Sequence, residues 1–178
     1  STIAFYNYGT VGQNEIDHCV GVNNYDDMVI PEMEFTSNDR MVAFGDTKAV
    51  IFEGAQKPQA IVEIPMDEKT KSIFYNEHYI GIVTGNEDEA VTNHLAVYDE
   101  NGKLVMEKDF GLDYSSIEFL TNNEICIRNA NVCDIYTVHG VYKFHHEFEE
   151  ELFEIIPGKL KLNYTLVLKD TTQRIRLK

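Results

Sequence analysis

The sequence predicts an all-β fold, a β-propeller-like repeat of four-stranded antiparallel blades with about four blades. Three observations lead to this prediction: short runs in which apolar and polar residues alternate, turn residues between those runs, and a recurrence of the whole pattern. No long stretch carries the 3.6-residue apolar period of an amphipathic helix, so we expect little helix.

The alternating runs are clearest at residues 41–44, 49–52, 94–98 and 125–127. A two-residue period places successive side chains on opposite faces of a strand, so each run is typical of a β-strand with two distinct faces. Clusters of turn-forming residues separate the runs, for example Asp, Glu, Asn and Gly at 99–102. The chain is therefore expected to fold as many short strands joined by turns.

The strand pattern recurs along the chain. Equivalent strand centres at Val42, Ile80, Ile125 and Leu166 are spaced 38, 45 and 41 residues apart. Four-stranded propeller blades repeat about every 40 to 45 residues, so this spacing is typical of propeller blades.

A second pattern places an aromatic residue four positions before a glycine. It occurs at Phe5 and Gly9, Tyr98 and Gly102, and Tyr136 and Gly140. Glycine supplies the positive φ that tight hairpin turns require, and Asn followed by Gly is a strong two-residue hairpin signal. We expect a hairpin turn at each of the three glycines.

The repeat gives one predicted propeller-type domain over 1–178. Its blades are predicted at 28–66, 70–110 and 114–149, with partial blades at 1–25 and 150–178. Unfinished blades leave strand edges that need partners. Three arrangements would provide them: closure into a small four-bladed ring, a homodimer that joins its unfinished edges in an eight-bladed ring, or a place in a longer chain as part of an incomplete arc.

Charge and composition limit the partners. The formal net charge of −15 repels nucleic acid and anionic lipid, so we expect no nucleic-acid partner. No apolar run approaches the roughly 18 residues of a membrane helix, and we expect a soluble segment without membrane contact of its own. Cys19, Cys126 and Cys133 are an odd number, which leaves their redox state open.

No catalytic motif, cofactor motif or metal-ligand spacing occurs, so we predict no catalytic residue, no cofactor and no metal centre. Cys126 stands between two isoleucines and is interpreted as a small strand residue rather than a metal ligand. If a cation binds, the acidic loop with Glu87, Asp88 and Glu89 is the better candidate, although it lacks the spacing of an EF-hand.

The segment at 6–14 contains more amide side chains than a strand and turn require. Asn7, Gln13 and Asn14 lie around two glycines and are the candidate ligand-binding residues. The ordinary interpretation of the segment is a loop at a propeller end that is closed by its own hydrogen bonds, and a ligand-facing loop is the alternative.

Several separated motifs occur in an order that resembles a known family. They are YNYGTVGQN at 6–14, EFTSNDRMVAFGD at 34–46, SIFYNEHYIGIV at 72–83, GVYKF at 140–144 and TQRIRLK at 172–178. The chain resembles the C-terminal half of a Firmicutes family classed as domains of unknown function. The resemblance implies an N-terminal membrane anchor in the parent protein and a propeller-like region on the extracellular face of a Gram-positive cell. It implies no catalytic or ligand-binding residues.

These observations predict a non-catalytic binding or scaffold module whose loops recognise protein or cell-envelope material. One alternative is a hydrolase or lyase whose site lies at the propeller centre, formed by acidic side chains with His78, His94 or His139. Another is a purely structural segment that completes a larger or dimeric propeller.

Overall fold

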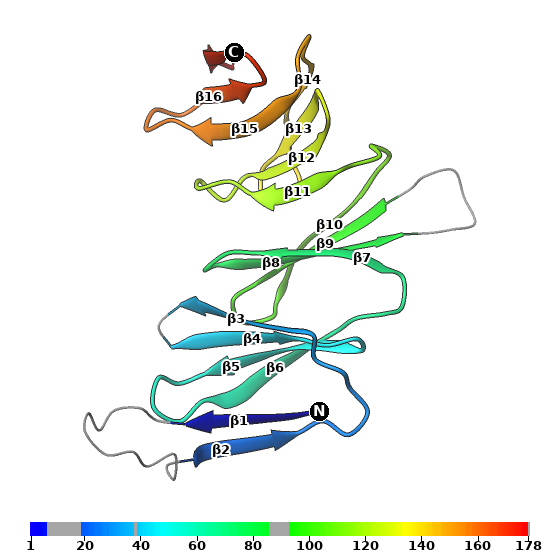
Figure 1. Cartoon of the computed structure of the whole chain (residues 1–178), viewed down its shortest axis with the longest axis vertical. Coiled ribbons are helices and arrows are strands. Elements are labelled where there is room, and N and C mark those ends of the chain that lie inside the picture. Colours follow the sequence, from blue (N-terminus) through cyan, green and yellow to red (C-terminus); the bar gives the residue numbers. More distant parts are fainter. Residues whose placement is uncertain (7–18, 38, 86–92, 178) are drawn as a thin grey trace. The chain divides into compact units, whose positions relative to one another are not determined.

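The computed structural model describes residues 1–6, 19–37, 39–85 and 93–177, and these form strands and no helix (Figure 1). The strands are β1 (Thr2–Tyr6), β2 (Cys19–Asn24), β3 (Glu32–Ser37), β4 (Arg40–Phe44), β5 (Lys48–Glu53), β6 (Gln59–Pro65), β7 (Thr70–Tyr75), β8 (Tyr79–Gly85), β9 (Asn93–Asp99), β10 (Leu104–Phe110), β11 (Ser116–Phe119), β12 (Ile125–Asn129), β13 (Val132–Tyr136), β14 (Tyr142–Glu147), β15 (Leu152–Pro157), β16 (Asn163–Leu168) and β17 (Thr172–Arg176).

Each sheet is a meander of strands that are neighbours in the sequence. Sheets β3 to β6, β7 to β10 and β11 to β14 have four strands, β15 to β17 has three, and β1 pairs with β2. The pairs within the β1–β2, β3–β6, β11–β14 and β15–β17 sheets and the β9–β10 pair are antiparallel. The predicted strand centres Val42, Ile80, Ile125 and Leu166 all lie in the second strand of their sheets. The all-β repeat of four-stranded antiparallel sheets is therefore confirmed.

Two of the three predicted glycine turns lie within the described residues. Gly102 has a φ of 73° and Gly140 a φ of 79°, values that a residue with a Cβ rarely adopts. In both hairpins the glycine N–H donates to the carbonyl three residues earlier, at 3.0 Å and 2.9 Å. The shared geometry explains the shared aromatic-to-glycine spacing. Gly9 lies outside the described residues.

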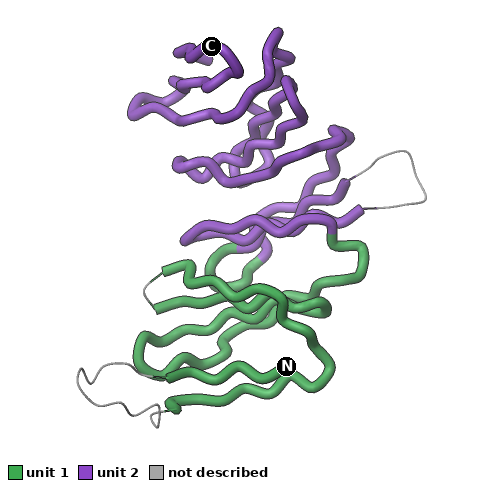
Figure 2. Tube along the Cα trace, in the orientation of Figure 1, with its two compact units in different colours: residues 1–70, 99–103 green, residues 71–98, 104–178 purple. Residues whose placement is uncertain are grey.

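The described chain forms two compact units (Figure 2). Unit 1 comprises residues 1–70 and 99–103, and unit 2 comprises 71–98 and 104–178. Unit 1 has a hydrophobic cluster of residues from the β1–β2 pair, its flanking loop and the β3–β6 sheet, in which the Phe5 and Phe52 rings meet edge to face at 5.2 Å. Within the described residues, no helix has the length and apolar character needed to cross a membrane.

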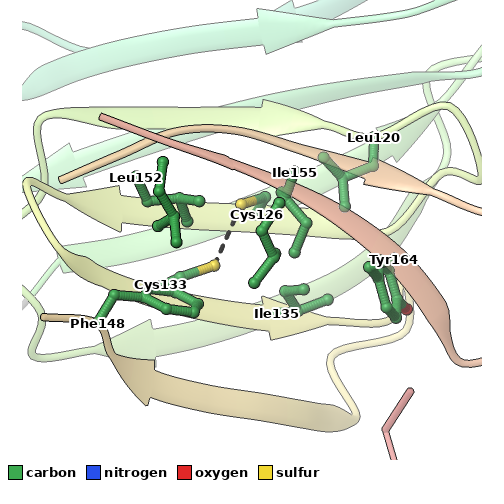
Figure 3. Packing of buried hydrophobic residues seen from close by; sticks show 10 residues of the cluster. Leu120, Cys126, Cys133, Ile135, Phe148, Leu152, Ile155 and Tyr164 are labelled. Carbon is green, nitrogen blue, oxygen red and sulfur yellow. Dashed lines mark hydrogen bonds between the residues drawn. The ribbon is translucent and has the colours of Figure 1, made fainter. Parts of the chain in front are cut away.

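Unit 2 has two hydrophobic clusters, one on each face of the β11–β14 sheet. Ile125 and Ile127 of β12 pack with residues of the β7–β10 sheet, whereas Cys126 between them packs with residues of the β15–β17 sheet. Figure 3 shows the second cluster, with Cys126 and Cys133 facing Leu152 and Ile155. The middle sheet of unit 2 is thus buried on both faces.

Candidate functional site

The residues singled out for ligand or cation binding lie outside the described part of the chain. This applies to Asn7, Gln13 and Asn14, and equally to Glu87, Asp88 and Glu89. Their roles stay predictions. Among the described residues, no group of three His, Cys, Asp or Glu side chains is placed to hold a metal ion.

The three histidines of the enzyme alternative lie on different elements. His78 follows β7, His139 lies in the β13–β14 turn, and His94 lies in β9. The Nδ1 atom of His94 is 2.7 Å from the Asp109 carboxylate, and its Nε2 atom is 3.5 Å from that of Glu107. The hydrogen bond with Asp109 raises the pKa of His94, opposed by partial burial and assisted by Glu107. His94 is therefore part of a surface ion pair between two neighbouring strands.

Cys126 and Cys133 meet in the core of unit 2. Their Sγ atoms are 3.6 Å apart, and both side chains are fully buried (Figure 3). The hydrogen bond with Cys133, together with burial, raises the pKa of the Cys126 thiol. A buried thiol held in its protonated form is a poor nucleophile and a poor metal ligand, so this pair contributes packing rather than chemistry.

A pocket of about 580 Å³ in unit 2 brings polar side chains together. It lies at the β11–β12 turn, the β13–β14 hairpin and the β15–β16 turn. Its polar lining includes Asn122, Glu124, Lys143, Lys161 and Asn163. None of these residues was singled out from the sequence.

The β11–β12 turn fixes the position of Glu124. Asn123 adopts a φ of 65°, which asparagine tolerates better than most residues, and its N–H donates to the Leu120 carbonyl at 2.8 Å. The Leu120 N–H in turn donates to the Glu124 carbonyl at 2.8 Å. The Asn122 amide donates to Glu124 Oε1. The turn therefore presents the carboxylate from a constrained backbone.

Glu124 is only 7% exposed, and two side chains from other strands compensate its buried charge. The Tyr164 hydroxyl of β16 donates to Glu124 Oε1 at 2.6 Å. The Lys143 ammonium of β14 lies 2.6 Å from Oε2, an oxygen that accepts no well-aligned hydrogen bond. The short distance shows that this contact is an ion pair. We call Glu124, Lys143 and Tyr164 the clamp, because they join the β11–β12 turn and strand β14 of one sheet to strand β16 of the next.

Lys143 completes the clamp by donating to the Tyr164 hydroxyl at 3.1 Å. Burial acts to lower the pKa of Lys143, but its contacts with the Glu124 carboxylate and the Tyr164 hydroxyl outweigh that effect and raise the pKa. Burial, followed by the hydrogen bond to Glu124, raises the pKa of Tyr164. At neutral pH the lysine is therefore charged and the tyrosine is neutral.

The clamp is suited to positioning rather than to proton transfer. Both Glu124 oxygens are engaged, and the Lys143 ammonium is held by the carboxylate and the phenol. What the pocket offers a ligand is the partly exposed ammonium of Lys143, the cations of the β15–β16 turn and several asparagine amides. These groups donate hydrogen bonds, so the pocket favours a polar ligand rich in acceptor oxygens.

Sequence reasoning missed the clamp because its members are 19 to 40 residues apart and form no local motif. A signal did exist for the neighbouring surface. Residues 158–178 contain six Lys and Arg and one Asp, although the whole chain carries a net charge of −15. Such charge asymmetry indicates that this segment is positively charged although the rest of the chain is acidic.

The fold is similar to solved structures at low sequence identity. Hsv2 from Kluyveromyces marxianus matches with a TM-score of 0.55 and 10% identity, over 89% of this chain and 50% of that chain. A eukaryotic initiation factor matches with a TM-score of 0.55 and 12% identity, over 86% and 42% of the two chains. BBS1N, crystallised in complex with ARL6DN, matches with a TM-score of 0.51 and 12% identity, over 86% and 53%.

This chain spans about half the length of the solved structures it matches. Hsv2 and BBS1N are β-propellers, and the likeness shows a propeller-like fold alone. No protein of curated function matches the sequence. The model of one family does match, over residues 1–177, and the chain belongs to that family, described as the family of unknown function DUF5711.

Proposed function

We propose that this chain is a non-catalytic binding module that recognises cell-envelope material on the extracellular face of a Gram-positive cell. The observation that carries the proposal is the pocket of about 580 Å³ beside the clamp. Its only lining carboxylate, among the described residues, is Glu124, which is already bound by Lys143 and Tyr164. A carboxylate held in this way does not act as a general base, whereas the surrounding cations and amides remain available to a ligand.

Two further observations support a binding role. A propeller-like fold is a rigid scaffold for loops, and one of the similar structures, BBS1N, was crystallised with a protein partner. The sequence resemblance to extracellular Gram-positive domains supports the location. Envelope glycans and their anionic substituents carry many acceptor oxygens, which the donors of this pocket suit.

The test is a glycan array together with retention of solubilised envelope fractions on the immobilised wild-type chain. The pocket variant is the double substitution Lys159→Glu and Lys161→Glu, which reverses two exposed charges of the pocket lining. The matched control is Lys57→Glu with Lys69→Glu, which reverses two exposed charges in unit 1 and changes the net charge equally.

Wild type and control are expected to retain the same ligands, and the pocket variant is expected to lose at least about ten-fold in affinity. Equal retention by the pocket variant would place binding elsewhere. If the wild-type chain retains no array glycan and no envelope component, the proposed function is wrong.

A further inference from the structure

The C-terminal sheet has an exposed face that differs in charge from the rest of the chain. The β16–β17 register pairs Asn163 with Arg176 and Thr165 with Arg174. It also pairs Tyr164 with Ile175, and both of these face the hydrophobic cluster of unit 2. Because side chains alternate along a strand, the two arginines share the opposite face, where both are exposed.

This face is hollowed. A depression of about 610 Å³ is lined by the two arginines, by Asn163 and Thr165 opposite them on β16, and by Lys159 of the β15–β16 turn. No acidic side chain lines it. Among the described residues, no carboxylate lies within ion-pair distance of these three cations. Within the described part of the chain, the depression is therefore a concentration of positive charge with no carboxylate paired to it.

The spacing of the arginines indicates what this charge would bind. Residues two apart on a strand are about 7 Å apart, at roughly 3.4 Å per residue. Guanidinium groups bind phosphate through two parallel hydrogen bonds, and they do so more specifically than ammonium groups. Two guanidiniums repeated along an extended strand match a linear polymer that carries one phosphate on each repeat. Asn163 and Thr165 lie opposite these arginines on β16, where they can contact hydroxyl groups of the linker.

We propose that the exposed face of β16 and β17 binds a linear phosphodiester polymer whose phosphates are linked by short polyol units, with Arg174 and Arg176 each contacting one phosphate. This inference names the ligand class of the proposed envelope-binding function, and it rests on that proposed function. The net charge of −15 opposes long nucleic acids and extended anionic membranes, which would contact the acidic remainder of the chain. A flexible single polymer strand contacts only the hollowed face.

The experiment measures binding of a fluorescent glycerol-phosphate oligomer to the whole chain by anisotropy. Wild type is expected to bind with an affinity that falls as salt rises, because phosphate contacts release counterions. Arg174→Gln with Arg176→Gln is expected to weaken binding roughly 10- to 100-fold. The matched control, Lys57→Gln with Lys69→Gln, removes the same charge from exposed positions of unit 1 and is expected to bind as wild type does.

Two further probes separate sources of anionic charge. Polygalacturonate carries repeated carboxylates, and binding as tight as that of the oligomer would overturn the preference for phosphate. Phosphatidylglycerol vesicles carry phosphates on a surface, and binding to vesicles without binding to the oligomer would overturn the polymer in favour of a membrane. Equal oligomer binding by wild type and the arginine variant would also overturn the inference.

The outcomes distinguish this inference from the proposed function. If wild type retains array glycans or envelope components but does not bind the oligomer, only the phosphodiester assignment fails. If it binds none of these ligands, the binding module itself is wrong. Because both arginines are exposed, thermal unfolding of the variant is expected to match wild type, which ties any lost binding to the surface.

Discussion

The two last sheets of unit 2 contain similar strands but bury them differently. In the β11–β14 sheet, adjacent residues of β12 enter different hydrophobic clusters, with Ile127 on one face and Cys126 on the other. In the β15–β17 sheet, Leu166 of β16 is fully buried, whereas its neighbour Val167 is only partly covered. One sheet is an inner layer with two apolar faces, and the other has a single apolar face.

This difference explains where polar recognition groups are found. A face that packs against another sheet must be apolar or fully paired, and β12 and β13 supply Ile125, Cys126, Ile127, Cys133 and Ile135 to the two clusters. A face that does not pack is free to carry charge at no cost in desolvation. The arginines of β17 occupy such a face, and the clamp lies at the rim where the two sheets meet. In the β15–β17 sheet, packing of one face against the hydrophobic cluster thus leaves the opposite face exposed, and that face carries the charged groups.

The largest expected effects come from truncating apolar residues on the opposite faces of the two sheets. Ile127→Ala and Ile135→Ala remove side chains from opposite faces of the β11–β14 sheet, and each is expected to cost about 2–5 kcal/mol. In β16, Leu166→Ala is expected to cost the same, but Val167→Ala no more than about 1 kcal/mol. Urea unfolding of the four variants measures these differences.

The comparison between the sheets depends on the contrast within β16. If Val167→Ala destabilises as much as Leu166→Ala, the outer face of the β15–β17 sheet is packed against something, and the contrast between one-faced and two-faced sheets is lost. If Ile127→Ala and Ile135→Ala differ strongly, one face of the β11–β14 sheet is less buried than the structure shows.

A smaller effect is expected at the clamp. Glu124→Gln retains the acceptor for Tyr164 but removes the charge that compensates Lys143, whose side chain is 22% exposed. Because Lys143 is partly solvated, we expect a loss of about 1–2 kcal/mol, below that of a fully buried ion pair. Urea unfolding at pH 8 measures it. Glu118→Gln is the matched control, since Glu118 pairs with Arg128 at 3.1 Å but is 42% exposed, and it is expected to cost under about 1 kcal/mol.

The clamp also predicts the direction of a pH dependence. Folding raises the pKa of Lys143 above its ordinary 10.5, so its stabilising contribution is complete below pH 10.5 and is lost as pH rises through the folded value. The difference in unfolding free energy between wild type and Glu124→Gln should therefore be constant from pH 7 to 9 and narrow above pH 10.5. A difference that widens with alkaline pH would contradict the ion pair.

The fold was predictable because its signals are local. Alternation within a strand, and a glycine at a fixed distance after an aromatic residue, each depend on a few neighbouring residues, so Ile125 and Leu166 could be assigned to equivalent strands. The spacing of the repeat then allowed the predicted strands to be grouped into four-stranded sheets of a propeller-like fold. Cys126 could likewise be assigned to a strand from its two isoleucine neighbours.

The candidate site could not be predicted, because it is made by contacts between strands. Glu124 lies in a polar turn, and nothing in its neighbourhood distinguishes a buried carboxylate from an exposed one. Its carboxylate accepts a hydrogen bond from Tyr164, which lies 40 residues later and in the next sheet. The positive face of β17 could not be recognised from the net charge for another reason. The value of −15 is a sum over the whole chain, in which the acidic excess elsewhere outweighs the two arginines.

The smallest expected effect is at an ion pair exposed to solvent, in contrast to the clamp. The hydrogen bond with Asp109 raises the pKa of His94, so the pair stabilises the chain fully below pH 6.5 and its contribution is lost as pH rises through the folded pKa. With its side chain 45% exposed, the pair contributes under about 1 kcal/mol, and salt screens it further. Asp109→Asn should lower the pKa of His94 in an NMR titration, while Glu154→Gln, on another sheet, should leave it unchanged. An unchanged titration in Asp109→Asn would mean that solvent rather than Asp109 determines the protonation of His94. Among the described residues, the coupling of side-chain protonation to folding stability would then be limited to buried pairs.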